Sequence, residues 1–121
     1  MVPVRPVEDP DDALGAVMAV LAASAREANL ARTAVIEEAL TALAAGQLDT
    51  ARREAAESAA HQVVGSAGTF GRHRASELAA GLEQWFREDA PAAADADRLA
   101  RARAQVVALR ADLAGGHQDE V

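Results

Sequence analysis

Apolar residues recur at every third or fourth position along most of this chain, which is the spacing of side chains that share one face of an α-helix. The pattern predicts four helices, over about residues 11–45, 50–70, 72–89 and 91–114. No stretch shows the alternation typical of a strand. Since the links between the helices are short, we expect an all-α fold, an antiparallel up-down-up-down four-helix bundle. Its first helix is unusually long, either one helix or two with a bend near Asn29.

Proline and glycine set the predicted boundaries. Prolines near the N-terminus cannot lie inside a helix and predict an extended arm before the first one. Gly46 and Gly71 end the first and second helices, and Pro91 suits the first position of the fourth. No linker divides the rest of the chain. The sequence therefore predicts an arm, one bundle and a loose tail, at residues 1–10, 11–116 and 117–121.

The composition argues against several classes of partner. The formal net charge is -7, which repels the phosphates of nucleic acids and anionic lipid headgroups. There is no cysteine for a disulfide or a thiolate metal site. The longest apolar run, around residues 13–23, is too short to span a bilayer. We therefore expect a cytoplasmic, monomeric protein with no nucleic-acid or membrane partner.

The chemically distinctive stretch lies in the second predicted helix. His61, Gly65 and Gly68 fall on one face, so almost no side-chain bulk surrounds the imidazole. The apolar seam follows a different line, at Ala56, Ala60, Val63, Ala67 and Phe70. His61 and Val63 are about 200° apart on the helix, so the ring should point away from the core. Each glycine costs a helix roughly 1 kcal/mol, which close approach by a second macromolecule would explain.

The segment from His61 to Gly71 reads His-Gln-Val-Val-Gly-Ser-Ala-Gly-Thr-Phe-Gly. It resembles the signature of the histidine-containing phosphotransfer (HPt) domain. It is most similar to the N-terminal phosphotransfer domain of chemotaxis histidine kinases, with which it shares Gly-x-Ala-Gly-Thr-Phe-Gly. The resemblance implies that His61 accepts a phosphoryl group on Nε2, and that Glu83 on the third helix orients the ring. It also implies a receiver-docking surface made of Gln62, Val64, Gly65 and Gly68.

The resemblance further implies the partners and the chemistry. A histidine kinase or the aspartate of a response-regulator receiver domain would donate the phosphoryl group, and a receiver would accept it. The receiver would supply Mg²⁺, so the bundle would need no cofactor, metal or nucleotide site of its own. A carboxylate that accepts one N–H of an imidazole leaves the other nitrogen free to attack phosphorus. The chain would thus be a phosphocarrier.

One position departs from the HPt pattern. Val64 stands where the family usually has a lysine that can meet the phosphoryl oxygens. Arg53 lies roughly 12 Å before His61 along the helix axis, and Arg72 lies roughly 16 Å beyond it, so neither is an evident replacement. The missing cation keeps a second interpretation open, namely a binding module that docks a receiver or kinase without phosphotransfer.

A third interpretation is a helical assembly protein. The first half of the long helix could extend past the bundle and expose its apolar side chains, Leu14, Val17, Met18 and Leu21. A metal site is a weaker candidate, because Glu57 and His61 offer two ligands one helical turn apart and no third ligand is evident. We expect Trp85 and Phe86 to lie in the core, since the chain has few other large rings to fill it.

Overall fold

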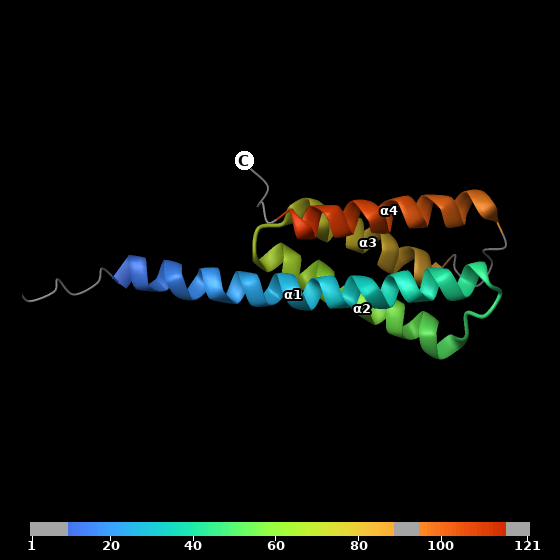
Figure 1. Cartoon of the computed structure of the whole chain (residues 1–121), viewed down its shortest axis with the longest axis horizontal. Coiled ribbons are helices and arrows are strands. Elements are labelled where there is room, and N and C mark those ends of the chain that lie inside the picture. The colour runs from blue at the N-terminus through green and yellow to red at the C-terminus, as the bar shows by residue number, and fades with distance from the viewer. Residues whose placement is uncertain (1–9, 89–94, 116–121) are drawn as a thin grey trace, which may run out of the picture.

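The computed structural model describes residues 10–88 and 95–115, and these residues form four helices and no strand. The helices are α1 (Pro10–Ala44), α2 (Thr50–Thr69), α3 (His73–Glu88) and α4 (Ala96–Ala114). Successive helices run in opposite directions, and each packs on the next, with α4 returning to lie against α1 (Figure 1). The predicted all-α, up-down-up-down four-helix bundle is confirmed.

Glycine ends α1 and α2 in the same way. Gly46 and Gly71 adopt φ values of 70° and 75°, a conformation that residues with a side chain rarely adopt. In the second of these turns the N–H of Arg72 bonds the carbonyl of Ala67 at 2.8 Å. This hydrogen bond across the helix end is the mark of a Schellman C-cap. Both turns reverse the chain, so α2 lies antiparallel to α1 and α3.

The long first helix is uninterrupted. The helix continues through Asn29, whose buried side chain donates a hydrogen bond of 3.1 Å to Ser66 on α2. The helix also begins one residue earlier than predicted, at Pro10. Proline fits the first turn of a helix, where its missing N–H would have had no partner. The rest of the predicted arm, residues 1–9, lies outside the described residues.

The fourth helix begins later than predicted. Pro91 lies outside the described residues, and Asp95 has the extended backbone of a residue that precedes a helix. Its carboxylate accepts a hydrogen bond of 2.9 Å from the N–H of Asp97, which makes Asp95 the N-cap. The described part of α4 therefore starts at Ala96, later than residue 91. The predicted tail, residues 117–121, also lies outside the description.

Small side chains build much of the core. Four residues of the predicted seam on α2 are buried, namely Ala56, Ala60, Val63 and Ala67. Phe70 at the end of that seam is only half-buried. On α3, Phe86 is fully buried and Trp85 is half-buried against it, with the two rings edge to face and 5.1 Å apart. The prediction for Phe86 is confirmed, and Trp85 lies at the edge of the core rather than inside it.

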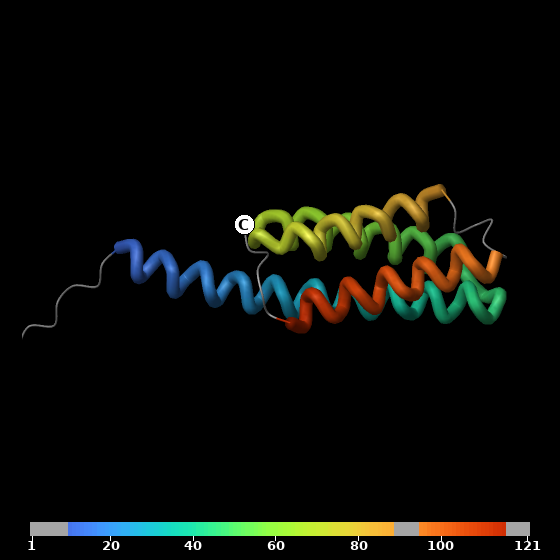
Figure 2. The backbone as a smooth tube through the Cα atoms, turned by 90° about the horizontal axis from the view of Figure 1, so that it is seen from above, coloured from blue at the N-terminus to red at the C-terminus, as the bar shows by residue number. Residues whose placement is uncertain are grey.

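The first turns of α1 extend beyond the other helices (Figure 2). Residues 10–21 are all exposed, and Asn29 is the first residue of α1 that is fully buried. By length and composition alone α1 could cross a membrane, and 6% of its most apolar 18-residue stretch is buried. A core helix of a soluble protein passes the same test of length and composition, so the test does not assign a membrane location.

Candidate functional site

His61 lies near the middle of α2, on the face away from the core. Its side chain is 73% exposed, whereas Val63, two residues later, is completely buried. This is the orientation predicted from the helical period. The ring lines a shallow depression of about 480 Å³ whose other walls come from α2 and α3, namely Glu54, Glu57, Ser58, Glu83 and Arg87. The imidazole is therefore within reach of a large partner.

Glu83 reaches the ring from α3. Its Oε2 lies 2.9 Å from Nδ1 of His61, and its side chain is only 13% exposed. The same oxygen accepts a hydrogen bond of 2.7 Å from Nη2 of Arg87. Because arginine can only donate, this oxygen acts as an acceptor, and we infer that the hydrogen shared with His61 belongs to Nδ1. The lone pair then lies on Nε2, in a ring that is mostly open to solvent.

Arg87 links Glu83 to a second carboxylate. Its Nε donates a hydrogen bond of 3.2 Å to Oε2 of Glu57 on α2. That hydrogen bond, together with the negative charges of Glu83 and Glu57, raises the pKa of Arg87 above its ordinary value. Glu57 also pairs with Arg53 on α2, whose Nη1 lies 3.8 Å from Oε1 of Glu57. Alternating charges therefore cross from α2 to α3 and hold the Glu83 carboxylate behind the imidazole.

The two glycines beside His61 differ in their surroundings. A Cβ added to Gly65 would meet no atom within 4 Å, so the helix surface there is bare. A Cβ added to Gly68 would lie 3.6 Å from Oγ of Ser76 on α3, and Gly68 is half-buried. The strip predicted to be bare along its whole length is therefore open at Gly65 and partly covered at Gly68, because α3 passes over its end.

The neighbours of His61 in the sequence face different helices. Val64 is half-buried and packs against the core, while its carbonyl accepts a hydrogen bond of 2.9 Å from Ser76. Gln62 is exposed, and its Oε1 accepts a hydrogen bond of 2.9 Å from Nε of Arg32 on α1. Val64 therefore offers a partner little side-chain surface, whereas Gln62 presents polar atoms on the α1 side of the ring.

The profile of the Hpt domain family matches residues 17–113, which is most of the chain and includes both His61 and Glu83. The chain belongs to the Hpt domain family. No curated protein and no solved structure matches it. Hpt domains serve histidine phosphotransfer in phosphorelay signalling, where they interact with kinases and receiver domains, and they are generally soluble.

Two arginines near the site of this Hpt domain were not predicted. Arg87 follows Glu83 by four residues on one helix, the spacing of a helical ion pair, so the sequence contained a signal for it. Arg32 had no such signal, because its bond to Gln62 depends on how α1 packs on α2. Arg72, considered as a replacement for the missing lysine, is buried and pairs with Asp112 on α4 instead.

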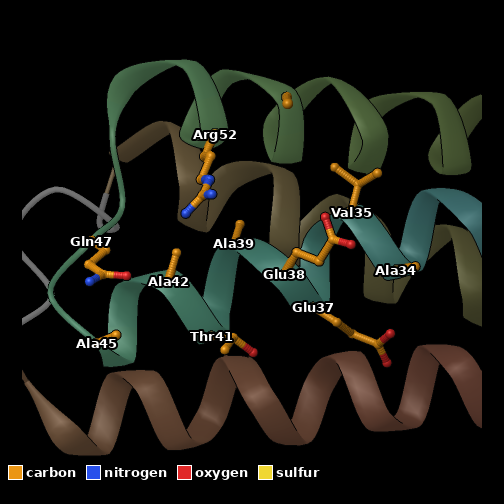
Figure 3. Close-up of a pocket in the computed structure, with 11 residues that line it drawn as sticks. Ala34, Val35, Glu37, Glu38, Ala39, Thr41, Ala42, Ala45, Gln47 and Arg52 are labelled. Carbon is orange, nitrogen blue, oxygen red and sulfur yellow. The ribbon is translucent and has the colours of Figure 1, made fainter.

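A larger groove of the Hpt domain, of about 590 Å³, lies between α1 and α2 near the turn that joins them (Figure 3). Arg52 extends across it from α2, and Glu37 turns toward α4 (Figure 3). There Glu37 pairs with Arg110 through two bonds of 2.7 and 2.8 Å. His61 does not line this groove. Within the described residues, no three or more His, Cys, Asp or Glu side chains are grouped to hold a metal.

Proposed function

We propose that this Hpt domain is a cytoplasmic phosphorelay carrier. It accepts a phosphoryl group on His61 from a histidine kinase or a receiver aspartate, and passes it to the receiver domain of a response regulator. The observation that carries the proposal is the contact of 2.9 Å between Nδ1 of His61 and Glu83, made by a ring that is 73% exposed. Such a ring combines a fixed lone pair with free access for a protein partner.

Transfer from a receiver is a displacement at phosphorus with the attacking and leaving atoms roughly in line. Nε2 of His61 forms the N–P bond as the P–O bond to the aspartate breaks, and the aspartate leaves as a carboxylate. Nδ1 keeps its hydrogen, so the ring becomes cationic and the hydrogen bond to Glu83 stabilises that charge. The reverse displacement returns the group to a receiver. The Mg²⁺ ion that neutralises the phosphoryl oxygens comes with the receiver.

The receiver docks over the bare part of α2. Gly65 leaves open space beside His61, and Gln62 presents its exposed amide on the side of α1. Gly68 and Val64 complete the surface where α3 begins to cover the helix. Reacting atoms must approach to about 3–3.5 Å. A bare helix surface therefore suits a step in which the active site of the partner must close onto the imidazole.

Arg87 and Arg32 flank the ring from α3 and α1, and we propose that they supply the positive charge that Val64 lacks. Arg87 shares the Glu83 oxygen with His61, and Arg32 bonds the residue that follows His61. Neither lies on α2, where the usual lysine would lie. Arg87 lines the depression at His61, and Arg32 reaches α2 from α1 at Gln62. This placement favours phosphotransfer over a module that only docks its partner.

Incubation with a phosphorylated receiver and Mg²⁺ tests the proposal. We expect label to move from the receiver to the Hpt domain, and to pass on when an unlabelled receiver is added. The label should be lost in acid and kept in base, as a phosphoramidate is. ATP alone should leave the domain unlabelled. An absence of label, or an acid-stable label, would reject the carrier and favour the docking module.

Replacing Glu83 with glutamine should slow labelling about tenfold to a hundredfold, by analogy with the loss of a carboxylate that orients a metal-binding histidine. The amide is neutral and carries both an acceptor and a donor, so it can pair with either form of the ring, which would then populate both tautomers. ¹⁵N NMR of the imidazole should show this mixture directly. Glu77→Gln, an exposed change on the same helix, is the matched control. Unchanged tautomers in Glu83→Gln would contradict the positioning role.

Replacing Arg87 with glutamine should slow labelling less, by about twofold to fivefold, because exposed ion pairs contribute little each. The loss combines a looser Glu83 with a weaker positive field at the phosphoryl oxygens. Arg87→Lys should recover part of the rate. Lysine restores the positive charge, but it lacks the planar guanidinium that bonds Glu57 and Glu83 at the same time. Arg103→Gln on α4 is the control. A wild-type rate in Arg87→Gln would show that the cation is dispensable.

A further inference from the structure

The exposed start of α1 is apolar and carries no charge over thirteen residues. Residues 13–25 contain no Asp, Glu, Arg or Lys, and five large apolar side chains there are 42 to 68% exposed, namely Leu14, Val17, Met18, Val20 and Leu21. Single exposed apolar residues are common, but a continuous group of this kind marks an interaction surface.

One stripe of this segment continues the buried face of α1. Asn29, Thr33 and Ile36 are buried by the bundle, and the same face, counted back by three or four residues, carries Ala25, Leu21, Met18 and Leu14. The other helices stop short of the first turns of α1 (Figure 2), where Leu14, Met18 and Leu21 are exposed, whereas Ala25 is half-buried at the edge of the bundle. The stripe therefore has the composition of a helix–helix contact without a partner helix in the monomer.

The spacing of the stripe is the same in both directions along the chain. Its positions, 14, 18, 21 and 25, follow steps of four, three and four residues. A second copy laid antiparallel, with the two-fold axis between residues 19 and 20, therefore places Leu14 opposite Ala25 and Met18 opposite Leu21. The larger Leu14 meets the smaller Ala25, so the two stripes can interdigitate.

Charges at the ends of the stripe fit the same pairing. The chain around the start of α1 is acidic, reading Glu-Asp-Pro-Asp-Asp over residues 8–12, and Arg26 follows the uncharged segment. In the antiparallel arrangement the acidic start of one copy lies level with residues 26–28 of the other, which include Arg26, and the two acidic starts lie at opposite ends of the pair. A parallel arrangement would instead bring the two acidic ends together. Charge therefore selects the antiparallel partner.

A groove at the end of the bundle lies where the partner helix would end. It has a volume of about 360 Å³, and its walls include Arg26, Asn29, Phe70, Arg72 and Leu113. Arg72 is 8% exposed, and its Nε has no hydrogen-bond partner among the described residues. An acidic segment arriving with a second copy would bring acceptors to this buried cation.

We propose that the N-terminal segment of α1, residues 10–25, is a self-association surface that forms an antiparallel dimer of this chain. The segment is about 24 Å long at 1.5 Å per residue. A helix pair of that length buries less than the roughly 800 Å² per partner of a stable interface, even with the groove added. The dimer is therefore weak, and it does not depend on the chemistry of His61.

Sedimentation of the full chain from about 1 µM to 1 mM tests the dimer. We expect wild type to shift from monomer to dimer, and Met18→Glu and Leu21→Glu to remain monomeric with unchanged helical content. Val20→Glu is the matched control, because Val20 is 68% exposed but lies on the opposite face of the helix. A wild-type monomer at 1 mM would overturn the proposal, and so would equal loss of association in Val20→Glu.

Two further measurements test the register. Arg26→Glu should weaken the dimer, and adding Asp12→Arg to it should restore association. Because the chain has no cysteine, a mixture of Leu14→Cys and Ala25→Cys chains should form a disulfide-linked pair more readily than either chain alone. No rescue and no preference for the mixed pair would reject the antiparallel register. Binding of the monomer to vesicles through Met18 would assign the surface to a membrane instead.

Discussion

We expect His61→Gln to abolish phosphorylation of this Hpt domain and to leave its fold and its receiver affinity nearly unchanged. Glutamine has no ring nitrogen to form the N–P bond, so no acid-labile label can accumulate. The side chain at this position is 73% exposed and bonds Glu83 at the protein surface, so the substitution should change stability by no more than about 0.5 kcal/mol. Labelling by a phosphorylated receiver, together with the thermal midpoint, checks both expectations.

His73→Gln is the matched control for this substitution. His73 is exposed at the start of α3 and lines no part of the depression at His61. We expect it to label at the rate of the wild type. Equal labelling of His61→Gln and the wild type would reject His61 as the acceptor. A regulatory output that survives His61→Gln, with receiver binding intact, would instead establish the docking module as the function.

Phe86→Ala should destabilise the domain by about 3–5 kcal/mol, a large part of the roughly 5–15 kcal/mol that holds a domain folded. Phe86 is fully buried, packs edge to face on Trp85 and is the largest buried side chain of a core built mainly from smaller residues. Alanine would leave a cavity that helices with fixed turns cannot close. The thermal midpoint should fall by about 15 °C or more.

The same substitution should also affect the site. Phe86 follows Glu83 by three residues, so it anchors the turn of α3 that presents the carboxylate to His61. We expect labelling of Phe86→Ala to fall with the folded fraction as temperature rises, and to recover on cooling. Val107→Ala, at a position 66% exposed on α4, should change the stability by about 0.5 kcal/mol or less. A midpoint of Phe86→Ala equal to that of the wild type would contradict this account of the core.

Much of the fold could be predicted because it depends on local periodicity. The seam from Ala56 to Ala67 and the glycines at 46 and 71 specify helices and their ends within a few residues of chain. The described start of α4 lies later than residue 91, because it depends on a side-chain cap that the apolar pattern does not locate. The capping bond from Asp95 to the N–H of Asp97 is what defines that start.

Two features of the site could be predicted from the sequence, namely the outward orientation of His61 and the identity of its partner, Glu83. The helical period predicts that His61 faces away from Val63, and the family motif suggests Glu83 as its partner. The cations beside the ring were not predicted, since Arg32 meets Gln62 only through the packing of α1 on α2. The partial cover of Gly68 by Ser76 depends likewise on the path of α3.

The sequence by itself determined the helices, the glycine turns that end the first two, and the exposed imidazole, because each of these follows from spacings within about two turns of helix. The tertiary structure alone decided which charges surround His61 and which part of α1 is left without neighbours. Those features depend on the relative lengths and crossings of helices that are distant in the chain. The apolar face that is buried at Ile36 is exposed at Met18 only because the other helices end before reaching it.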